Sequence, residues 1–234
     1  MVSELVELLK LENQLFVSHE TIYKIIRKDK AEGGTLYKHC RHKLKHRKRP
    51  VGEKIPIKNR ISIDQRPDIV NTGQRFGDWE IDTIVGENNR GAIVTIVERK
   101  TDFLLMEKLK KGKNATELTK VVFKLLLAYI NHVHTITADN GTEFADHENI
   151  AKLLKTKLFF THPYASYEKG NIENENKLIR QYIPKKTNFD TLNNQEIKQI
   201  QYKINNRPRK KINFYSPKEI FYLNLQNKNV AFCS

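Results

Sequence analysis

The sequence predicts an α/β fold in which helices flank a mixed β-sheet, with a small, basic helical segment in front of it. Three apolar runs rich in β-branched residues follow one another between residues 76 and 110. Strand and helix patterns then alternate from residue 114 to residue 205, and Lys and Arg dominate residues 24–60. A meander of strands followed by alternating strands and helices is typical of a mixed sheet with helices packed on its faces.

The first 50 residues are predicted to be a partial helical region that ends in a basic run. Apolar residues at helical spacing indicate a helix over residues 3–16. Ser18 is a suitable N-cap for a second helix over residues 19–27. Residues 51–75 contain prolines and polar residues but no long periodic segment, so we expect a linker there.

Residues 76–227 are predicted to form the main domain. Its first part contains three strands, at residues 76–86, 91–100 and 102–110, and Asn-Asn-Arg-Gly between the first two favours a hairpin turn. The elements predicted after them are a helix at 114–131, a strand at 134–138, a helix at 144–154, a strand at 158–161, and helices at 171–183 and 195–205. This order of strands and helices is that of an RNase H-like fold.

Composition excludes several classes of protein. Hydrophobic residues make up 38% and charged residues 29% of the chain, which favours a soluble globular protein. No apolar run reaches the length of a membrane span, and the start of the chain lacks the pattern of a secretory signal. We therefore expect a cytoplasmic protein with no membrane partner, in which the two cysteines stay reduced.

The net charge of +15 is unevenly distributed. Residues 24–60 hold 14 Lys/Arg and three Asp/Glu, and residues 177–211 hold ten and two, whereas residues 61–176 hold 15 and 17. A near-neutral centre between two basic segments suits a polyanionic partner such as DNA. A generally basic surface without such a partner is the plainer alternative.

Three carboxylates occupy positions that suit a metal site. Asp82 lies among isoleucines in the first strand of the main domain, where an unpaired acid is costly. Asp139 ends a strand at an Asp-Asn-Gly turn, and such strand ends often present functional groups. Glu173 lies in the first turn of a helix, with 33 residues between it and Asp139. Taken singly, each has a plainer interpretation, as a salt-bridged strand residue, a turn former or a solvated helix residue.

Taken together, the three acids predict a site for phosphodiester cleavage that holds two divalent ions. Such chemistry needs several carboxylates around hard cations about 3.5–4 Å apart. Mg²⁺, or Mn²⁺ in its place, prefers oxygen ligands and keeps several waters, so two or three protein carboxylates suffice. The chain offers no convincing Ser/His/Asp or Cys/His set for nucleophilic catalysis instead.

The chain resembles the insertion sequence 30 family of bacterial transposases, which have an integrase-type catalytic core. The resemblance runs from about residue 18 to about residue 223. Its carriers are SHETIYKII at 18–26, GDWEIDTIVG at 77–86, TADNGTEF at 137–144, HPYASYEKGNIENENKLIRQYIPK at 162–185 and NNRPRKKINFYSPKEIF at 205–221. The resemblance assigns the catalytic and metal-binding triad to Asp82, Asp139 and Glu173. Asp78 and Glu80 share a strand face with Asp82, and only the resemblance favours Asp82 over them.

The chain departs from the family pattern in three places. Tyr167-Glu168-Lys169 stands where the family usually has Trp, Gln or Glu, and Arg, and Ile172 precedes the glutamate where Asn is usual. Members usually carry a further N-terminal helix-turn-helix region, of which residues 18–28 resemble the tail. The sequence is therefore compatible with a truncated copy.

Basic residues near the predicted site and in the two basic segments are candidate DNA contacts. Asn140 and Glu143 are expected to orient the turn that carries Asp139. The candidate contacts are Lys43, Lys45, Arg47, Lys48, Arg49, His162, Lys169, Arg180, Lys185, Lys186, Arg207, Arg209, Lys210 and Lys211.

The resemblance implies metal-dependent cleavage and strand transfer at the ends of an insertion sequence. Its partners would be double-stranded DNA and further copies of the chain, since joining two DNA ends implies a homo-oligomer. Two alternatives remain open at this point: a metal-dependent endonuclease without strand transfer, and an inactive truncated copy that only binds DNA.

Overall fold

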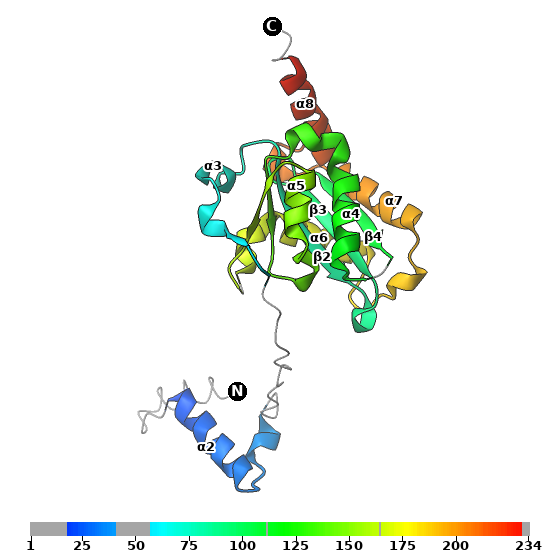
Figure 1. Cartoon of the computed structure of the whole chain (residues 1–234). Coiled ribbons are helices and arrows are strands. Elements are labelled where there is room, and N and C mark those ends of the chain that lie inside the picture. The colour runs from blue at the N-terminus through cyan, green and yellow to red at the C-terminus, as the bar shows by residue number, and fades with distance from the viewer. Residues whose placement is uncertain (1–17, 41–56, 111, 164, 231–234) are drawn as a thin grey trace. The chain divides into compact units, whose positions relative to one another are not determined.

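The computed structural model describes residues 18–40, 57–110, 112–163 and 165–230. The chain divides into two units, residues 1–54 and residues 55–234 (Figure 1). The predicted helix at 3–16 and the basic run at 41–50, with Lys43, Lys45, Arg47, Lys48 and Arg49, lie outside the described residues.

The described part of the first unit contains the helix α2 (His19–Ala31) and the 3₁₀ turn η1 (Leu36–His39). The predicted N-cap is confirmed, because the backbone N–H of Thr21 donates to the side-chain oxygen of Ser18. No residue of α2 is buried. Cys40 follows η1 as a free cysteine.

A six-stranded mixed sheet forms the centre of the second unit, as predicted (Figure 1). Its order is β1-β6-β5-β2-β3-β4, and β3 runs antiparallel to both of its neighbours while the other pairs are parallel. The strands are β1 (Ile61–Ser62), β2 (Asp78–Val85), β3 (Ala92–Glu98), β4 (Leu104–Leu109), β5 (Thr135–Ala138) and β6 (Lys157–Phe160).

Helices cover both faces of this sheet, with α4 and α5 on one side and α6 and α7 on the other (Figure 1). The α-helices are α3 (Asp68–Asn71), α4 (Ala115–Leu126), α5 (His147–Leu153), α6 (Gly170–Tyr182), α7 (Asn194–Asn205) and α8 (Pro217–Val230). The 3₁₀ turns are η2 (Ile63–Gln65), η3 (Glu87–Asn89), η4 (Leu127–His132), η5 (Thr142–Phe144), η6 (Ser166–Lys169), η7 (Phe189–Thr191) and η8 (Lys210–Ile212).

The alternation of side chains along β2 decides which of them face the candidate site. Trp79 and Ile81 pack into the apolar cluster beneath α4 and α5, where Trp79 contacts Tyr129 and Phe221. Ile84 packs into the second cluster, with residues of α6 and α7. Because successive strand residues point to opposite faces, the three acids of β2 lie on the α6 side.

The structure differs from the sequence prediction at both ends of this unit. The segment expected as a linker, residues 51–75, contributes β1 and α3, and β1 pairs with β6. A strand of two residues leaves no periodic pattern that could reveal it. The helix α8 was also missed, although Ser216 and Glu219 exchange the hydrogen bonds of a capping box at its start.

Within the described part of the chain, no helix is long and apolar enough to span a membrane.

Candidate active site

Two of the three predicted acids lie side by side because of the register between β2 and β5. These parallel strands pair Asp78 with Thr135 and Glu80 with Thr137. Asp82 stands two residues after Glu80, and Asp139 stands two residues after Thr137, just beyond the end of β5, so the sheet brings these two carboxylates to neighbouring positions. Residues 139–141, Asp-Asn-Gly, then turn the chain away from the end of β5.

Hydrogen bonds fix the turn after β5 in place. The backbone N–H of Gly141 donates to Oδ1 of Asp139 over 2.9 Å, and Nδ2 of Asn140 donates to the carbonyl of Thr161 over 2.6 Å. Glu143 is buried and accepts hydrogen bonds from Oγ1 of Thr83 and Nζ of Lys113. Asn140 thus connects the turn to the end of β6, and Glu143 connects the residues after the turn to β2.

Asp82 is largely enclosed, and its carboxylate is held on both oxygens. Oδ1 accepts from the backbone N–H of Thr83 over 2.8 Å, and Oδ2 accepts from Nδ2 of Asn176 on α6 over 2.9 Å. Burial raises the pKa of Asp82, and the nearby charge of Asp139 raises it further, while the charge of Lys169 lowers it. Asn176 was not predicted from the sequence, although it stands one helical turn after Glu173.

A buried ammonium group stands between the two aspartates. Lys169, at the end of η6, is 5% exposed, and its Nζ lies 3.6 Å from Oδ1 of Asp82 and 3.5 Å from Oδ2 of Asp139. It also donates to the carbonyl of Ile81 over 3.4 Å. The sequence placed Lys169 among the candidate DNA contacts, and in the structure its ammonium group contacts the carboxylates of Asp82 and Asp139.

Glu173 lies where the sequence predicted, in the first turn of α6, but its carboxylate pairs with a lysine of the same helix and not with the group that contains Asp82 and Asp139. Its Oε1 pairs with Nζ of Lys177 at 3.2 Å, and the side chain is 45% exposed. Among the described residues, no group of three His, Cys, Asp or Glu side chains lies close enough together to hold a metal ion. The structure thus brings together two of the three predicted ligands and leaves the third on the helix that contacts Asp82 through Asn176.

The other two acids of β2 have structural partners. Asp78 is buried, pairs with Arg75 and accepts a hydrogen bond from Thr135. Glu80 is buried against Arg99, and its Oε2 accepts from the backbone N–H of Ile172 over 2.8 Å. Since Ile172 directly precedes Glu173, Glu80 positions the start of the helix that carries the third acid. Asp78 and Glu80 are thus paired with arginines of the protein, whereas Asp82 is paired with Lys169.

The donor set fits a hard divalent cation. Asp82 and Asp139 offer carboxylate oxygens, which Mg²⁺ and Mn²⁺ prefer, on a fixed frame of two paired strands. The ammonium group of Lys169 stands in for such a cation, because it neutralises both carboxylates at once. In this arrangement Asp82 and Asp139 are the residues that could hold a metal, whereas Glu173 pairs with Lys177.

The structure divides the predicted DNA contacts into exposed and internally bonded side chains. Arg180 donates to the carbonyl of Val85 over 3.1 Å, and Arg209 pairs with the buried Glu175 at 3.0 Å. These two arginines therefore hold elements of the protein together. Apart from Lys169, the other described predicted contacts are exposed at the surface: His162, Lys185, Lys186, Arg207, Lys210 and Lys211. Of these, His162 also contacts Asp64 and Glu168, and Lys211 also pairs with Asp102.

Several transposases are similar in sequence to this chain over most of its length. The transposase for insertion sequence element IS4351 of Bacteroides fragilis is 46% identical over 229 residues, which cover 96% of this chain and 70% of that protein. The chain belongs to the insertion sequence 30 family of transposases. The transposase InsI for insertion sequence element IS30A of Escherichia coli is 33% identical, over 89% of this chain and 56% of its own length. A comparison with described protein families finds no match.

A solved structure supports the fold. The catalytic core domain of BIV integrase superposes with a TM-score of 0.51 at 20% identity and covers 65% of this chain and 98% of that domain. This likeness confirms the predicted RNase H-like fold of the second unit.

Proposed function

We propose that this chain catalyses metal-dependent cleavage of DNA and strand transfer at the ends of an insertion sequence, with Asp82, Asp139 and Glu173 as the metal ligands. The observation that supports the proposal is that Asp82 and Asp139, which follow the register of β2 and β5, both contact the ammonium group of Lys169 within an integrase-like fold. Membership of a transposase family supports the reaction class.

The protein groups of the site would act mainly by position. Thr83 and Asn176 hold Asp82, and the backbone of Gly141 holds Asp139. Two divalent ions, when bound, would neutralise charge on the attacking and leaving oxygens of the phosphodiester. Glu173 would join the two aspartates by a change of rotamer, because its exposed ion pair with Lys177 is worth only about 0–1 kcal/mol.

Double-stranded DNA is the proposed partner, and a homo-oligomer on DNA is the proposed assembly. The support for DNA is the net charge of +15 and the exposed basic side chains that follow α6. The support for an oligomer is that joining reactions act on two ends at once.

The test is a pair of assays on labelled DNA that carries the ends of the element: cleavage of intact ends, and joining of pre-cut ends to target DNA. We expect Asp82→Asn, Asp139→Asn and Glu173→Gln each to lower both activities by at least about a hundredfold in Mg²⁺. The exposed Asp190 in η7 provides a matched control, and Asp190→Asn is expected to leave both unchanged. Wild-type rates in Asp139→Asn would refute the site, and cleavage without joining would replace the proposal by an endonuclease.

A further inference from the structure

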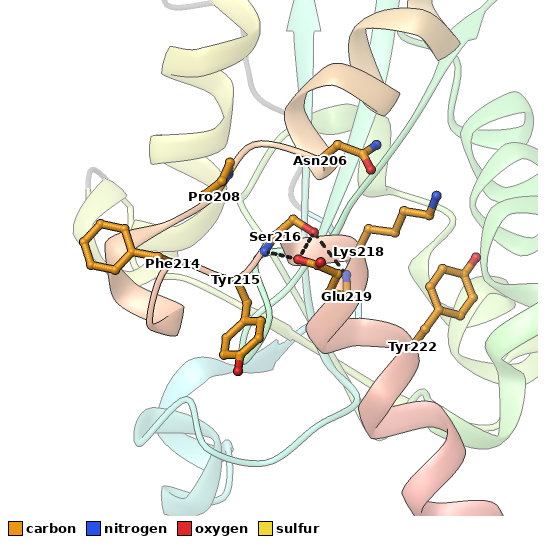
Figure 2. A pocket seen from close by; sticks show the side chains of 8 residues that line it. All are labelled: Asn206, Pro208, Phe214, Tyr215, Ser216, Lys218, Glu219 and Tyr222. Atoms are coloured by element: carbon orange, nitrogen blue, oxygen red, sulfur yellow. Dashed lines mark hydrogen bonds between the residues drawn. The ribbon is translucent and has the colours of Figure 1, made fainter.

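A hollow of about 550 Å³ lies at the junction between the segment after α7 and the start of α8 (Figure 2). None of the acids of the candidate active site lines it. Its aromatic lining comes from two places: Phe214 and Tyr215 from the segment that follows η8, and Tyr222 from α8. The remaining lining residues are Asn206, Pro208, Ser216, Lys218 and Glu219.

The three aromatic side chains are unusually exposed for their size. Phe214 is 70% exposed, Tyr215 53% and Tyr222 43%. A group of large apolar side chains at the surface, beside a hollow, is typical of a binding site. Packing within the protein gives no reason for the exposure of Phe214.

The backbone that presents Phe214 is strained. Asn213 has a φ of 54° and Phe214 a φ of 64°, and this left-handed region is unfavourable for a bulky residue such as phenylalanine. The strain is held by hydrogen bonds from the backbone N–H groups of Phe214 and Asn213 to the carbonyls of Arg209 and Lys210. The backbone conformation that exposes the Phe214 ring to solvent therefore lowers the stability of the folded protein.

The surroundings of the hollow are basic. Residues 203–218 contain six Lys and Arg and no Asp or Glu. Arg209 and Lys211 are used internally, because they pair with Glu175 and Asp102 and so tie the segment to α6 and to the β3–β4 connection. Lys210 is exposed beside the aromatic segment, and Lys218 lies over the ring of Tyr202. The carboxylate of Glu219 accepts hydrogen bonds from Ser216 at the start of α8.

We propose that this hollow is a second DNA subsite, which takes an unpaired base of the DNA by stacking it on Phe214 and Tyr215 while Lys210 and Lys218 contact the adjoining phosphates. Exposed aromatic rings within a basic surface are the combination that binds unstacked bases, because every base has a face that can stack. Lys218 in the lining and the exposed Lys210 beside it favour a nucleic acid over an apolar protein segment as the occupant. The proposal rests on DNA being the partner of this chain, as proposed above, but not on the catalytic site.

The experiment measures binding of a short forked DNA with 2-aminopurine as its first unpaired base, and of the same DNA fully paired, in EDTA. Stacking quenches the fluorescence of 2-aminopurine, so it reports on the base itself. We expect Phe214→Ala and Tyr215→Ala to abolish the quenching and to weaken binding of the fork about tenfold, with less than a twofold change for the paired DNA. Phe214→Trp keeps an aromatic face and is expected to retain binding.

Two further variants separate stacking from charge and from loss of apolar surface. Lys210→Gln is expected to weaken both DNAs equally and to reduce the dependence of affinity on salt concentration, as the loss of a phosphate contact does. Leu153 on α5 is 45% exposed, and Leu153→Ala is expected to change nothing. A thermal melt of each variant confirms that it is folded.

Equal effects of Phe214→Ala on forked and paired DNA, or undiminished quenching in Phe214→Ala, would overturn the subsite. Because the assay contains no metal, it is independent of cleavage. Quenching by Asp82→Asn would support the subsite even if that protein cleaves no DNA. Cleavage by the wild-type protein without any quenching would refute the subsite but leave the proposed reaction intact.

Discussion

The ammonium group of Lys169 lies 3.6 Å from the carboxylate of Asp82, inside the protein and at the point where the sheet also presents Asp139. Two carboxylates held this close repel each other, and a buried cation between them relieves the repulsion. A divalent metal ion bound to the same carboxylates, as proposed above, would do the same. It would then compete with Lys169 for one position, and the lysine side chain would have to move away.

We therefore expect Lys169→Met to increase the affinity of the DNA-free protein for Mn²⁺ by about tenfold. This change is smaller than the Coulomb attraction between the lysine and its two carboxylates, because solvent screens part of that attraction. Electron paramagnetic resonance of unbound Mn²⁺ measures this without any reaction. The matched control is Lys152→Met at the end of α5, which is expected to leave the affinity unchanged. Unchanged or weaker Mn²⁺ binding in Lys169→Met would show that the lysine does not occupy the position of the metal.

A second prediction concerns Glu80, which links β2 to the first turn of α6. Glu80→Ala removes the partner of the buried Arg99 and the acceptor of the Ile172 N–H. Because it leaves an uncompensated charge inside the protein, we expect it to lower the free energy of unfolding by about 3–5 kcal/mol. Urea denaturation measures the change.

The control for Glu80 is the pair between Glu107 and Lys124, in which the glutamate side chain is 15% exposed and the lysine side chain 66% exposed. Glu107→Ala is expected to cost less than Glu80→Ala, because the lysine charge that it leaves unpaired lies in solvent. A cost for Glu80→Ala no larger than that of Glu107→Ala would contradict a structural role for the buried pair.

The sequence predicted the main domain well where a strand or helix has a periodic apolar pattern, or where neighbouring residues by themselves define a turn. Strands β2 to β6, helices α4 to α7, and the Asp-Asn-Gly turn that carries Asp139 lie close to their predicted places. The position of Glu173 in the first turn of α6 was also anticipated, because helix starts have recognisable residues.

The partners of these residues could not be predicted, since they depend on contacts between distant segments. From the sequence, Lys169 was predicted to contact DNA. In the structure it lies against Asp82, which stands 87 positions earlier in the chain. Arg209 similarly turns inward to Glu175. A charged residue in a sequence indicates the sign of the charge that its partner carries. It does not indicate whether that partner is another residue of the protein or a separate molecule.

A third prediction concerns Asn205, at the end of α7. Its side chain accepts from the backbone N–H of Leu104 and donates to the carbonyl of the same residue, over 2.9 and 2.8 Å, and so joins α7 to the edge strand β4. Asn205→Leu would leave both backbone groups buried without these bonds, and we expect a loss of about 2–4 kcal/mol in the free energy of unfolding.

The neighbouring Asn206 offers a close control for Asn205. It is exposed and donates to the carbonyl of Tyr202 within its own helix. Asn206→Leu is expected to change stability by less than about 0.5 kcal/mol in chemical denaturation, as surface substitutions usually do. Equal effects of the two substitutions would show that the bonds across to β4 do not stabilise the fold.

The last prediction is a dependence on pH in the segment that leads into α6. His162 is bonded through Nδ1 to Glu168 at 2.7 Å and through Nε2 to Asp64 at 3.1 Å. The hydrogen bonds to Glu168 and Asp64 raise the pKa of His162 above its ordinary value of 6.5. Because the raised pKa belongs to the folded protein, this bridge contributes fully below pH 6.5 and is lost as the pH rises through the raised value.

The titration of the His162 ring, followed by nuclear magnetic resonance, tests this directly. We expect Glu168→Gln to move the pKa of His162 down toward 6.5, since the strongest of its partners is lost, and Asp64→Asn to lower it by a smaller amount. A pKa of His162 that stays the same in both variants would mean that the imidazolium bridge between Asp64 and Glu168 does not form in solution.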